Sequence, residues 1–124
     1  MSERKKPNVV REKSFAFALQ VIKLVQWVQD EKREFVLSKQ LMRSGTAIGA
    51  LVREAEHAQS RPDFIHKMNL ALKEANETDY WIELLSQSKL ITAAHYDTLH
   101  PHIQELIKLL VSIVKTCKSP PYNP

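Results

Sequence analysis

The chain has 124 residues, of which 44% are hydrophobic and 26% are charged. This balance is typical of one globular domain, and it excludes disorder over most of the chain. The single cysteine, Cys117, excludes a disulfide framework and a zinc site built from thiolates. The net charge of +4 is compatible with nucleic-acid binding, but many proteins with no such role share it.

Targeting segments are not expected from the sequence. Residues 1–13 are polar and basic, and they lack the apolar region of a secretory signal. The most apolar window, residues 106–114, is interrupted by Lys108 and Ser112 and is shorter than the roughly 20 residues that a membrane span requires. We therefore expect a cytoplasmic protein that has no membrane partner.

The first predicted helix covers residues 14–30. Its apolar side chains recur at intervals of three and four residues, which is the helical period, and Ser14 is the expected N-cap. Residues 1–13 are expected to form a basic tail outside the bundle. The charged residues 30–34 are expected to connect this helix to the next.

The second predicted helix, residues 36–58, carries two apolar stripes. One is an unbroken heptad seam, and the other contains Gly45 and Gly49. Each glycine costs a helix roughly 1 kcal/mol relative to alanine, so close approach by a neighbouring helix is the expected compensation. That neighbour belongs either to the same bundle or to a second subunit, and both interpretations stay open.

The third predicted helix covers residues 61–88. Ser60 and Asp63 resemble a capping box at its start. Its apolar seam follows the same spacing of three and four residues. The members of this seam are Phe64, Met68, Ala71, Ala75, Thr78, Ile82 and Leu85.

The fourth predicted helix covers residues 92–116. Pro101 lies inside it and is expected either to kink or to divide it. Its apolar stripe ends at Cys117, for which we expect a buried structural thiol. Residues 118–124 form a Pro-rich tail that cannot continue the helix.

Four helices with short connectors predict an all-α fold, an antiparallel up-down-up-down four-helix bundle. In that arrangement Arg43 lies level with Glu74 and Glu77, which predicts an ion network that fixes helix register. The alternative is an acid pair for general acid/base chemistry. The sequence shows no nucleophile beside them, no phosphate-binding glycine loop and no Ser-His-Asp set. We therefore predict no catalytic residues and no enzyme.

Weaker candidates also have structural explanations. Glu54 and His57 have the Glu-x-x-His spacing of di-iron bundles, but the first helix has no interior carboxylate. Tyr80 and Trp81 could stack on bases, although their helical spacing favours packing in the core or at an interface. Three histidines near the proline are better explained as surface residues than as metal ligands. They are His95, His100 and His102, and we predict neither a metal nor a cofactor.

The second and third helices also carry a recognisable pattern. It comprises Gln40-Leu41-Met42-Arg43-Ser44, Ile48, Glu54-Ala55, Ser60, Asp63-Phe64 and Ala71-Leu72-Lys73-Glu74-Ala75-Asn76-Glu77-Thr78-Asp79-Tyr80-Trp81. The part Lys-Glu-Ala-x-Glu-Thr-x-Tyr-Trp is the most specific. With this pattern, residues 14–117 resemble the four-helix-bundle family of proteins encoded by intervening sequences within bacterial 23S ribosomal RNA genes, once labelled S23 ribosomal proteins.

The resemblance implies a left-handed antiparallel four-helix bundle that assembles as a ring-like homopentamer. It also implies similarity to the accessory variability protein of diversity-generating retroelements, a basic pentamer that partners a reverse transcriptase and binds nucleic acid. The sequence departs from the family at Ala47 and Leu51, where the family often has Ser and Asn. These departures favour packing and put a polar site at the two positions in doubt.

Basic residues concentrate near both ends of the chain. Residues 1–18 and residues 108–124 each carry a net charge of +3, whereas residues 73–107 carry −4. Both chain ends lie at one end of an antiparallel bundle, so that end is predicted to be basic and to bind phosphate backbones. The candidate residues are Arg4, Lys5, Lys6, Arg11, Lys13, Lys115 and Lys118.

Two functions from different classes stay open. The leading hypothesis is a non-enzymatic homo-oligomeric adaptor, a pentamer by the resemblance, that binds RNA or DNA without sequence specificity. The alternative is a protein-interaction scaffold that docks a partner such as a reverse transcriptase and makes no direct contact with nucleic acid. Salt-dependent retention of nucleic acid favours the first, and co-purification with a protein after nuclease treatment favours the second.

Overall fold

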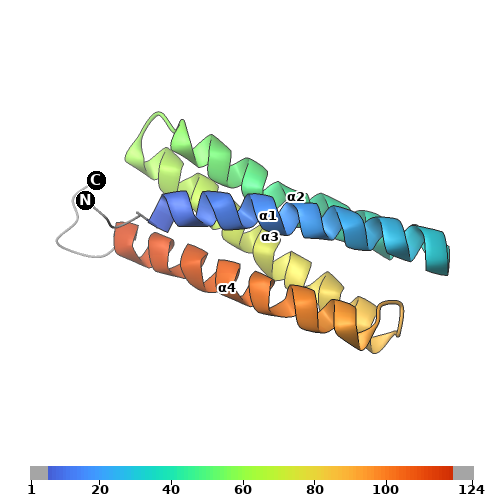
Figure 1. Ribbon diagram of the computed structural model, residues 1–124. Coiled ribbons are helices and arrows are strands. Elements are labelled where there is room, and N and C mark those ends of the chain that lie inside the picture. The colour runs from blue at the N-terminus through green and yellow to red at the C-terminus, as the bar shows by residue number, and fades with distance from the viewer. Residues whose placement is uncertain (1–5, 119–124) are drawn as a thin grey trace.

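The computed structural model describes residues 6–118, which form helices joined by short connections (Figure 1). The elements are α1 (Lys6–Trp27), a short π-helix η1 (Val28–Lys32), α2 (Leu37–Glu56), α3 (Arg61–Gln87) and α4 (Ala93–Lys118). No strand occurs in this part of the chain, so the predicted all-α class with four long helices is confirmed. None of the described helices combines the length and hydrophobicity that crossing a membrane requires.

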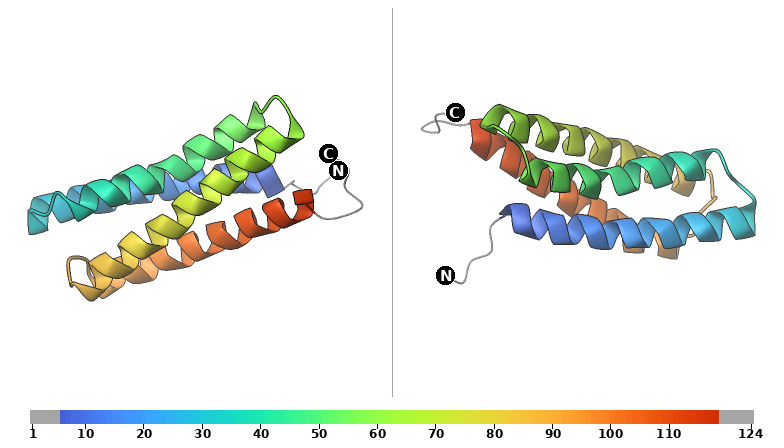
Figure 2. Two further views of the ribbon diagram at one scale, coloured as in Figure 1. Left: turned by 180° about the vertical axis from the view of Figure 1, so that it is seen from behind. Right: turned by 90° about the horizontal axis from the view of Figure 1, so that it is seen from above.

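The four long helices form a bundle in which each helix packs against two others (Figures 1 and 2). α1 contacts α2 and α4, and α3 contacts the same two helices. The α2–α3 turn lies at the same end as the start of α1 and the end of α4. The α1–α2 and α3–α4 connections lie at the opposite end.

The apolar seams of α3 and α4 face the centre of the bundle. Spacings of three and four residues place these side chains on one face of each helix, as the sequence predicted. Their removal from water stabilises the fold by roughly 25 cal/mol per Å² of apolar surface. The buried members are Met68, Ala71, Ala75, Thr78, Ile82 and Leu85 on α3, and Leu99, Ile103, Leu106, Leu110, Ile113 and Cys117 on α4.

α1 begins earlier than the sequence indicated. The expectation that residues 1–13 form a tail is wrong from Lys6 onward, because α1 starts there. Val10 is fully buried and extends the apolar spacing of the helix toward its start. Ser14 is not the N-cap, because it is buried inside the helix and its hydroxyl donates to the carbonyl of Arg11 at 3.1 Å. A serine inside a helix satisfies its hydroxyl in this way.

α4 runs through Pro101 as one helix. Of the two outcomes that the sequence left open, the division of this helix therefore does not occur. The proline ring occupies an exposed position, where it meets solvent and not a neighbouring helix. Proline has no backbone N–H, so α4 lacks the hydrogen bond that this residue would otherwise donate to the carbonyl one turn earlier.

A pair of buried hydroxyls joins α2 to α3. Thr78 Oγ1 lies 2.9 Å from Ser44 Oγ, and both residues are fully buried. Thr78 Oγ1 also lies 2.8 Å from the carbonyl oxygen of Glu74, so Thr78 donates there and accepts from Ser44. A buried hydroxyl without a partner costs about 1–3 kcal/mol, and this arrangement avoids that cost.

The two ends of α3 are closed by different devices. At its start, Ser60 Oγ accepts the backbone N–H of Asp63 at 3.2 Å, which confirms the predicted cap. At its end, Lys89 has a positive φ of 64°, and the N–H of Leu90 reaches the carbonyl of Leu85 at 2.9 Å. This is the Schellman arrangement, in which glycine is the usual left-handed residue.

Glu34 caps the start of α2 from the preceding connection. Its carboxylate accepts the backbone N–H groups of Val36, Leu37 and Ser38 at 2.9, 2.7 and 2.8 Å. Partial burial works to raise the pKa of Glu34, but these hydrogen bonds outweigh it and hold the pKa below its usual value. The negative charge of this carboxylate also interacts favourably with the positive end of the α2 helix dipole.

Candidate functional site

The polar residues predicted to lie between α2 and α3 come together in the structure. Arg43 Nη1 lies 3.1 Å from Glu74 Oε1, and Arg43 Nη2 donates to Glu77 Oε2. Trp81 Nε1 donates to the same oxygen of Glu77 at 3.2 Å. The Arg43 side chain is 49% exposed, so these residues form an ion network at the surface of the bundle.

The network keeps the carboxylate of Glu77 ionised. Partial burial works to raise the pKa of Glu77, but hydrogen bonds from Arg43 and Trp81 outweigh it and lower the pKa. The hydrogen bond to Glu77 in turn raises the pKa of Arg43. A lowered pKa disfavours Glu77 as a general acid, which must hold a proton near neutral pH. Arg43 and Trp81 both donate to Glu77 Oε2, so this oxygen is engaged and poorly placed to act as a general base. The geometry therefore favours an ion network over an acid pair.

The glycine stripe of α2 packs inside the bundle. A Cβ atom added to Gly45 would lie 2.9 Å from Val21 Cγ2 on α1, closer than real Cβ contacts. A Cβ atom added to Gly49 would lie 3.4 Å from Ser14 Oγ, also on α1. The close approach that these glycines permit is therefore between α1 and α2 of the same chain.

The predicted phosphate-binding residues fall into two groups. The first group lies outside the part of the chain whose side chains the structure describes: Arg4, Lys5, Lys6 and Lys118. The second group has described side chains on α1 and α4: Arg11, Lys13 and Lys115. Only this second group can be placed against the acidic residues around it.

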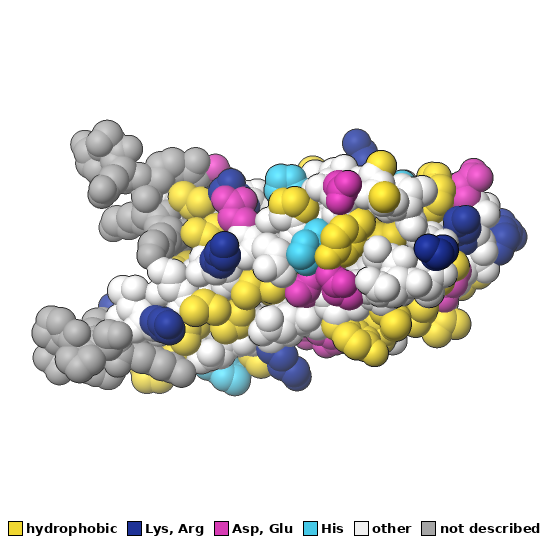
Figure 3. All heavy atoms as spheres, turned by 90° about the horizontal axis from the view of Figure 1, so that it is seen from below, with side chains coloured by type: hydrophobic (Ala, Val, Ile, Leu, Met, Phe, Trp, Pro, Cys, Tyr) yellow, Lys and Arg dark blue, Asp and Glu magenta, His cyan; other side chains and the backbone are white. Residues whose placement is uncertain are grey.

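The described basic residues of α1 face different neighbours. Arg11 Nε lies 3.5 Å from Glu56 Oε2 on α2, whereas Lys13 Nζ lies 3.2 Å from Glu105 Oε2 on α4. Lys115 is exposed on α4. On the face shown in Figure 3, Lys and Arg side chains are spread from one end to the other. The structure therefore does not gather Arg11 and Lys13 on one side of α1.

The weaker candidates have local partners. Glu54 pairs with Lys67, whose Nζ lies 3.0 Å from its carboxylate, and His57 is exposed. Tyr80 is 57% exposed, and its ring centroid lies 5.0 Å from that of the half-buried Trp81. These contacts place Glu54 in a surface ion pair and Tyr80 at the outer face of α3.

The three histidines near Pro101 do not converge. His95 packs edge-on against the indole of Trp27, with ring centroids 4.3 Å apart, and burial lowers the pKa of His95. His102 is exposed. His100 instead lies between α3 and α4, where its ring faces acidic side chains of α3. The sequence interpretation of His100 as a surface histidine missed this position.

Residues 6–112 match the family described as 23S rRNA-intervening sequence protein. The chain belongs to this family. It is 53% identical to a protein of unknown function from the S23 ribosomal protein family of Bacteroides thetaiotaomicron VPI-5482, whose crystal structure superposes with a TM-score of 0.87. That match covers 90% of this chain and 99% of the other. No curated protein matches the chain.

In this member of the 23S rRNA-intervening sequence family, the most specific stretch serves contacts between helices. It covers residues 73–81, on the middle of α3. Within it Glu77 contacts Arg43, and Thr78 contacts Ser44, both across the seam with α2. Within this stretch, Glu77 and Thr78 therefore join α3 to α2.

Proposed function

We propose that the protein is a non-enzymatic homo-oligomeric adaptor that binds RNA or DNA where α1 begins and α4 ends. The observation that carries this proposal is the polarity of charge. Residues 1–18 and 108–124 each have a net charge of +3, against −4 for residues 73–107. Membership in a family described by its link to 23S rRNA adds support. Recognition rests on phosphates, because charge contacts position a backbone without reading bases.

The ion pairs of α1 are compatible with this role. The side chains of Arg11 and Lys13 are each 45% exposed while they contact Glu56 and Glu105. Exposed ion pairs contribute about 0–1 kcal/mol, so a phosphate group displaces the carboxylate at little cost. The two cations then contribute to the attraction without loss of fold.

The proposed oligomer is an antiparallel four-helix subunit repeated in a ring, a pentamer by the family resemblance. Phe15 and Leu19 support it, since they lie one turn apart on α1 and remain 52% and 50% exposed. A second copy can cover this apolar face. Light scattering should give about five times the 14.3 kDa chain mass, and Leu19→Lys should reduce that mass. A monomeric wild type at micromolar concentration would reject the oligomer.

Nucleic-acid binding is best tested by substitution of charges. A truncation at residue 13 is unsuitable, because α1 begins at Lys6 and Val10 is buried. The test variant is Lys6→Gln, Lys115→Gln and Lys118→Gln, and the matched control is Lys23→Gln, Lys32→Gln and Lys39→Gln. Both variants lose the same charge, but the control residues lie away from the proposed surface, on α1, η1 and α2.

Each protein is titrated against two unrelated single-stranded RNAs of equal length over a range of salt concentrations. The test variant should bind both RNAs more weakly, with a log–log salt slope smaller by roughly 0.7 for each phosphate that the variant no longer neutralises. The control should retain most of the wild-type affinity. Equal losses of affinity in the two variants, or no binding by the wild type at low salt, would overturn the proposed surface.

The second candidate is a scaffold that docks a protein such as a reverse transcriptase. Phe15 and Leu19 favour it if no second copy covers them, because exposed apolar side chains one turn apart suit a contact with another protein. Co-purification with a protein after nuclease treatment, together with a lack of RNA binding, would support this scaffold. Loss of that protein on nuclease treatment would support the adaptor.

A further inference from the structure

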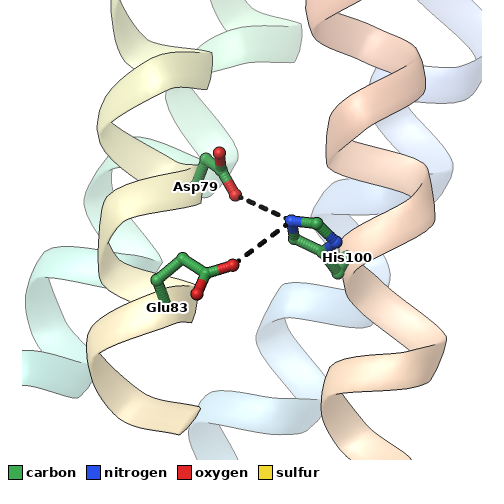
Figure 4. A group of neighbouring side chains, drawn as sticks. All are labelled: Asp79, Glu83 and His100. Atoms are coloured by element: carbon green, nitrogen blue, oxygen red, sulfur yellow. Dashed lines mark ion pairs between the residues drawn. The ribbon is translucent and has the colours of Figure 1, made fainter. Parts of the chain in front are cut away.

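A second polar cluster, separate from the proposed nucleic-acid surface, joins α3 to α4 (Figure 4). Asp79 and Glu83 lie one turn apart on α3, and His100 points toward both from α4. His100 Nε2 lies 3.3 Å from Asp79 Oδ1 and 3.3 Å from Glu83 Oε2. One ligand atom from each residue lies within 4.8 Å of the other two.

We propose that Asp79, Glu83 and His100 bind a divalent transition-metal ion of the Zn²⁺ class. Tetrahedral zinc holds its ligands at about 2.0–2.2 Å, which places them roughly 3.3–3.6 Å from one another. The distances from His100 Nε2 to Asp79 Oδ1 and to Glu83 Oε2 match this separation between two zinc ligands. An imidazole combined with carboxylates suits zinc and its neighbours, whereas Mg²⁺ and Ca²⁺ prefer oxygen ligands alone.

Neighbouring residues of α4 hold the ligands in place. Gln104 Nε2 donates to Asp79 Oδ2 at 3.2 Å, and the Tyr96 hydroxyl donates to Glu83 Oε2. The Tyr96 ring also stacks on the imidazole of His100, with centroids 4.6 Å apart and planes 13° apart. Hydrogen bonds and packing of this kind orient ligand side chains and raise metal affinity.

Asp79 Oδ1 supplies an independent observation. Among the described residues this oxygen is shielded from solvent, and beyond His100 Nε2 at 3.3 Å it has no polar partner. A buried acceptor in this state is unfavourable, and coordination of a metal ion would satisfy it. The side chains of Asp79 and His100 are still 27% and 26% exposed, so water can complete the coordination. The ion would clamp α3 to α4.

Calorimetric titration of ZnCl₂ into the metal-stripped full chain tests the proposal. The wild type should bind one ion per chain with micromolar affinity. His100→Ala should weaken binding more than the roughly 10–100-fold loss expected when an outer partner is removed. Tyr96→Phe removes such an outer partner, so its loss of Zn²⁺ affinity should fall within that range. The matched control is His102→Ala, which removes an exposed imidazole from the same helix and should bind as the wild type does.

Two further measurements separate loss of the ligand from loss of the fold. Zn²⁺ should raise the melting temperature of the wild type and of His102→Ala but not that of His100→Ala, because a ligand stabilises the state that binds it. Co²⁺ should give visible absorption bands with the wild type that are lost with Asp79→Asn. Absence of saturable binding, or equal affinity in His100→Ala and the wild type, would overturn the site. The cluster would then be a polar contact between His100 and two carboxylates that joins α3 to α4.

Discussion

Gly45 on α2 lies against Val21 on α1, and the space between them is too small for one more carbon atom. A Cβ at position 45 would meet both methyl groups of Val21, at 2.9 and 3.0 Å. The contact involves the tips of one β-branched side chain, which has few rotamers available to move away. One turn further along α2, a Cβ at Gly49 would meet Ser14 at 3.4 Å or more.

Gly45→Ala should therefore lower the free energy of unfolding, whereas Gly49→Ala should not. Alanine favours a helix by about 1 kcal/mol over glycine at either position. At Gly45 overpacking against Val21 costs about 1–3 kcal/mol, so a net loss is expected, whereas Gly49→Ala should be neutral or stabilising. Urea denaturation measures both. The addition of Val21→Ala should relieve the Gly45→Ala defect, and equal effects of the two single substitutions would contradict the close approach.

Arg43→Met should destabilise the fold by about 1 kcal/mol. A buried pair would lose about 3–5 kcal/mol, but the Arg43 side chain is 49% exposed, and exposed pairs contribute far less. A double-mutant cycle with Glu77→Gln isolates the coupling, and Arg11→Met serves as a control for an ordinary surface pair. A coupling energy well above 1 kcal/mol would show that solvent does not screen this network.

Glu34→Gln should lower stability at neutral pH by about 1 kcal/mol, as the loss of a helix cap does. The folded pKa of Glu34 lies below its ordinary 4.5, so the ionised form is favoured by folding. Its contribution is present above pH 4.5 and is lost as the pH falls through the folded pKa. The wild type and the variant should therefore converge in acid. Glu31→Gln, at an exposed position of η1, is the control, and a difference that persists in acid would refute the cap.

Tyr96→Phe should change stability in alkali. The hydrogen bond to Glu83 is the main cause that raises the pKa of Tyr96 from 10 to about 12. Between these values the folded state keeps the proton and the unfolded state releases it, so wild-type stability falls as the pH rises through this window. Tyr96→Phe has no hydroxyl to titrate, so its stability should fall less than that of the wild type over this pH range. Urea midpoints on both sides of pH 10 measure it, with the exposed Tyr80→Phe as control.

Strict spacing made most of the core predictable. Every buried side chain of the α3 and α4 seams, from Met68 to Cys117, recurs at three or four residues, and few other folds satisfy that pattern. The start of α1 was not predictable in this way. Only Val10 marks the buried face there, among charged residues that resemble a tail. Ser14 likewise fits a cap and a helix interior equally well.

The two polar clusters differed in predictability because of the turns that align them. The α2–α3 turn is marked by Ser60, so the sequence alone places Arg43 level with Glu77. The α3–α4 turn contains Lys89 in a left-handed conformation that usually marks glycine. Without a glycine to mark this turn, the sequence did not show that Asp79 on α3 lies opposite His100 on α4.

The hydroxyl pair of Ser44 and Thr78 bears on how the bundle avoids misassembly. The seams of α2 and α3 repeat, so a slide of one helix by a turn, about 5.4 Å, would still bury apolar side chains. Such a slide would separate the two hydroxyls and break the hydrogen bond between them, at a cost of about 1 kcal/mol. That difference exceeds thermal energy, so these two small polar groups favour a single alignment over slipped competitors during folding.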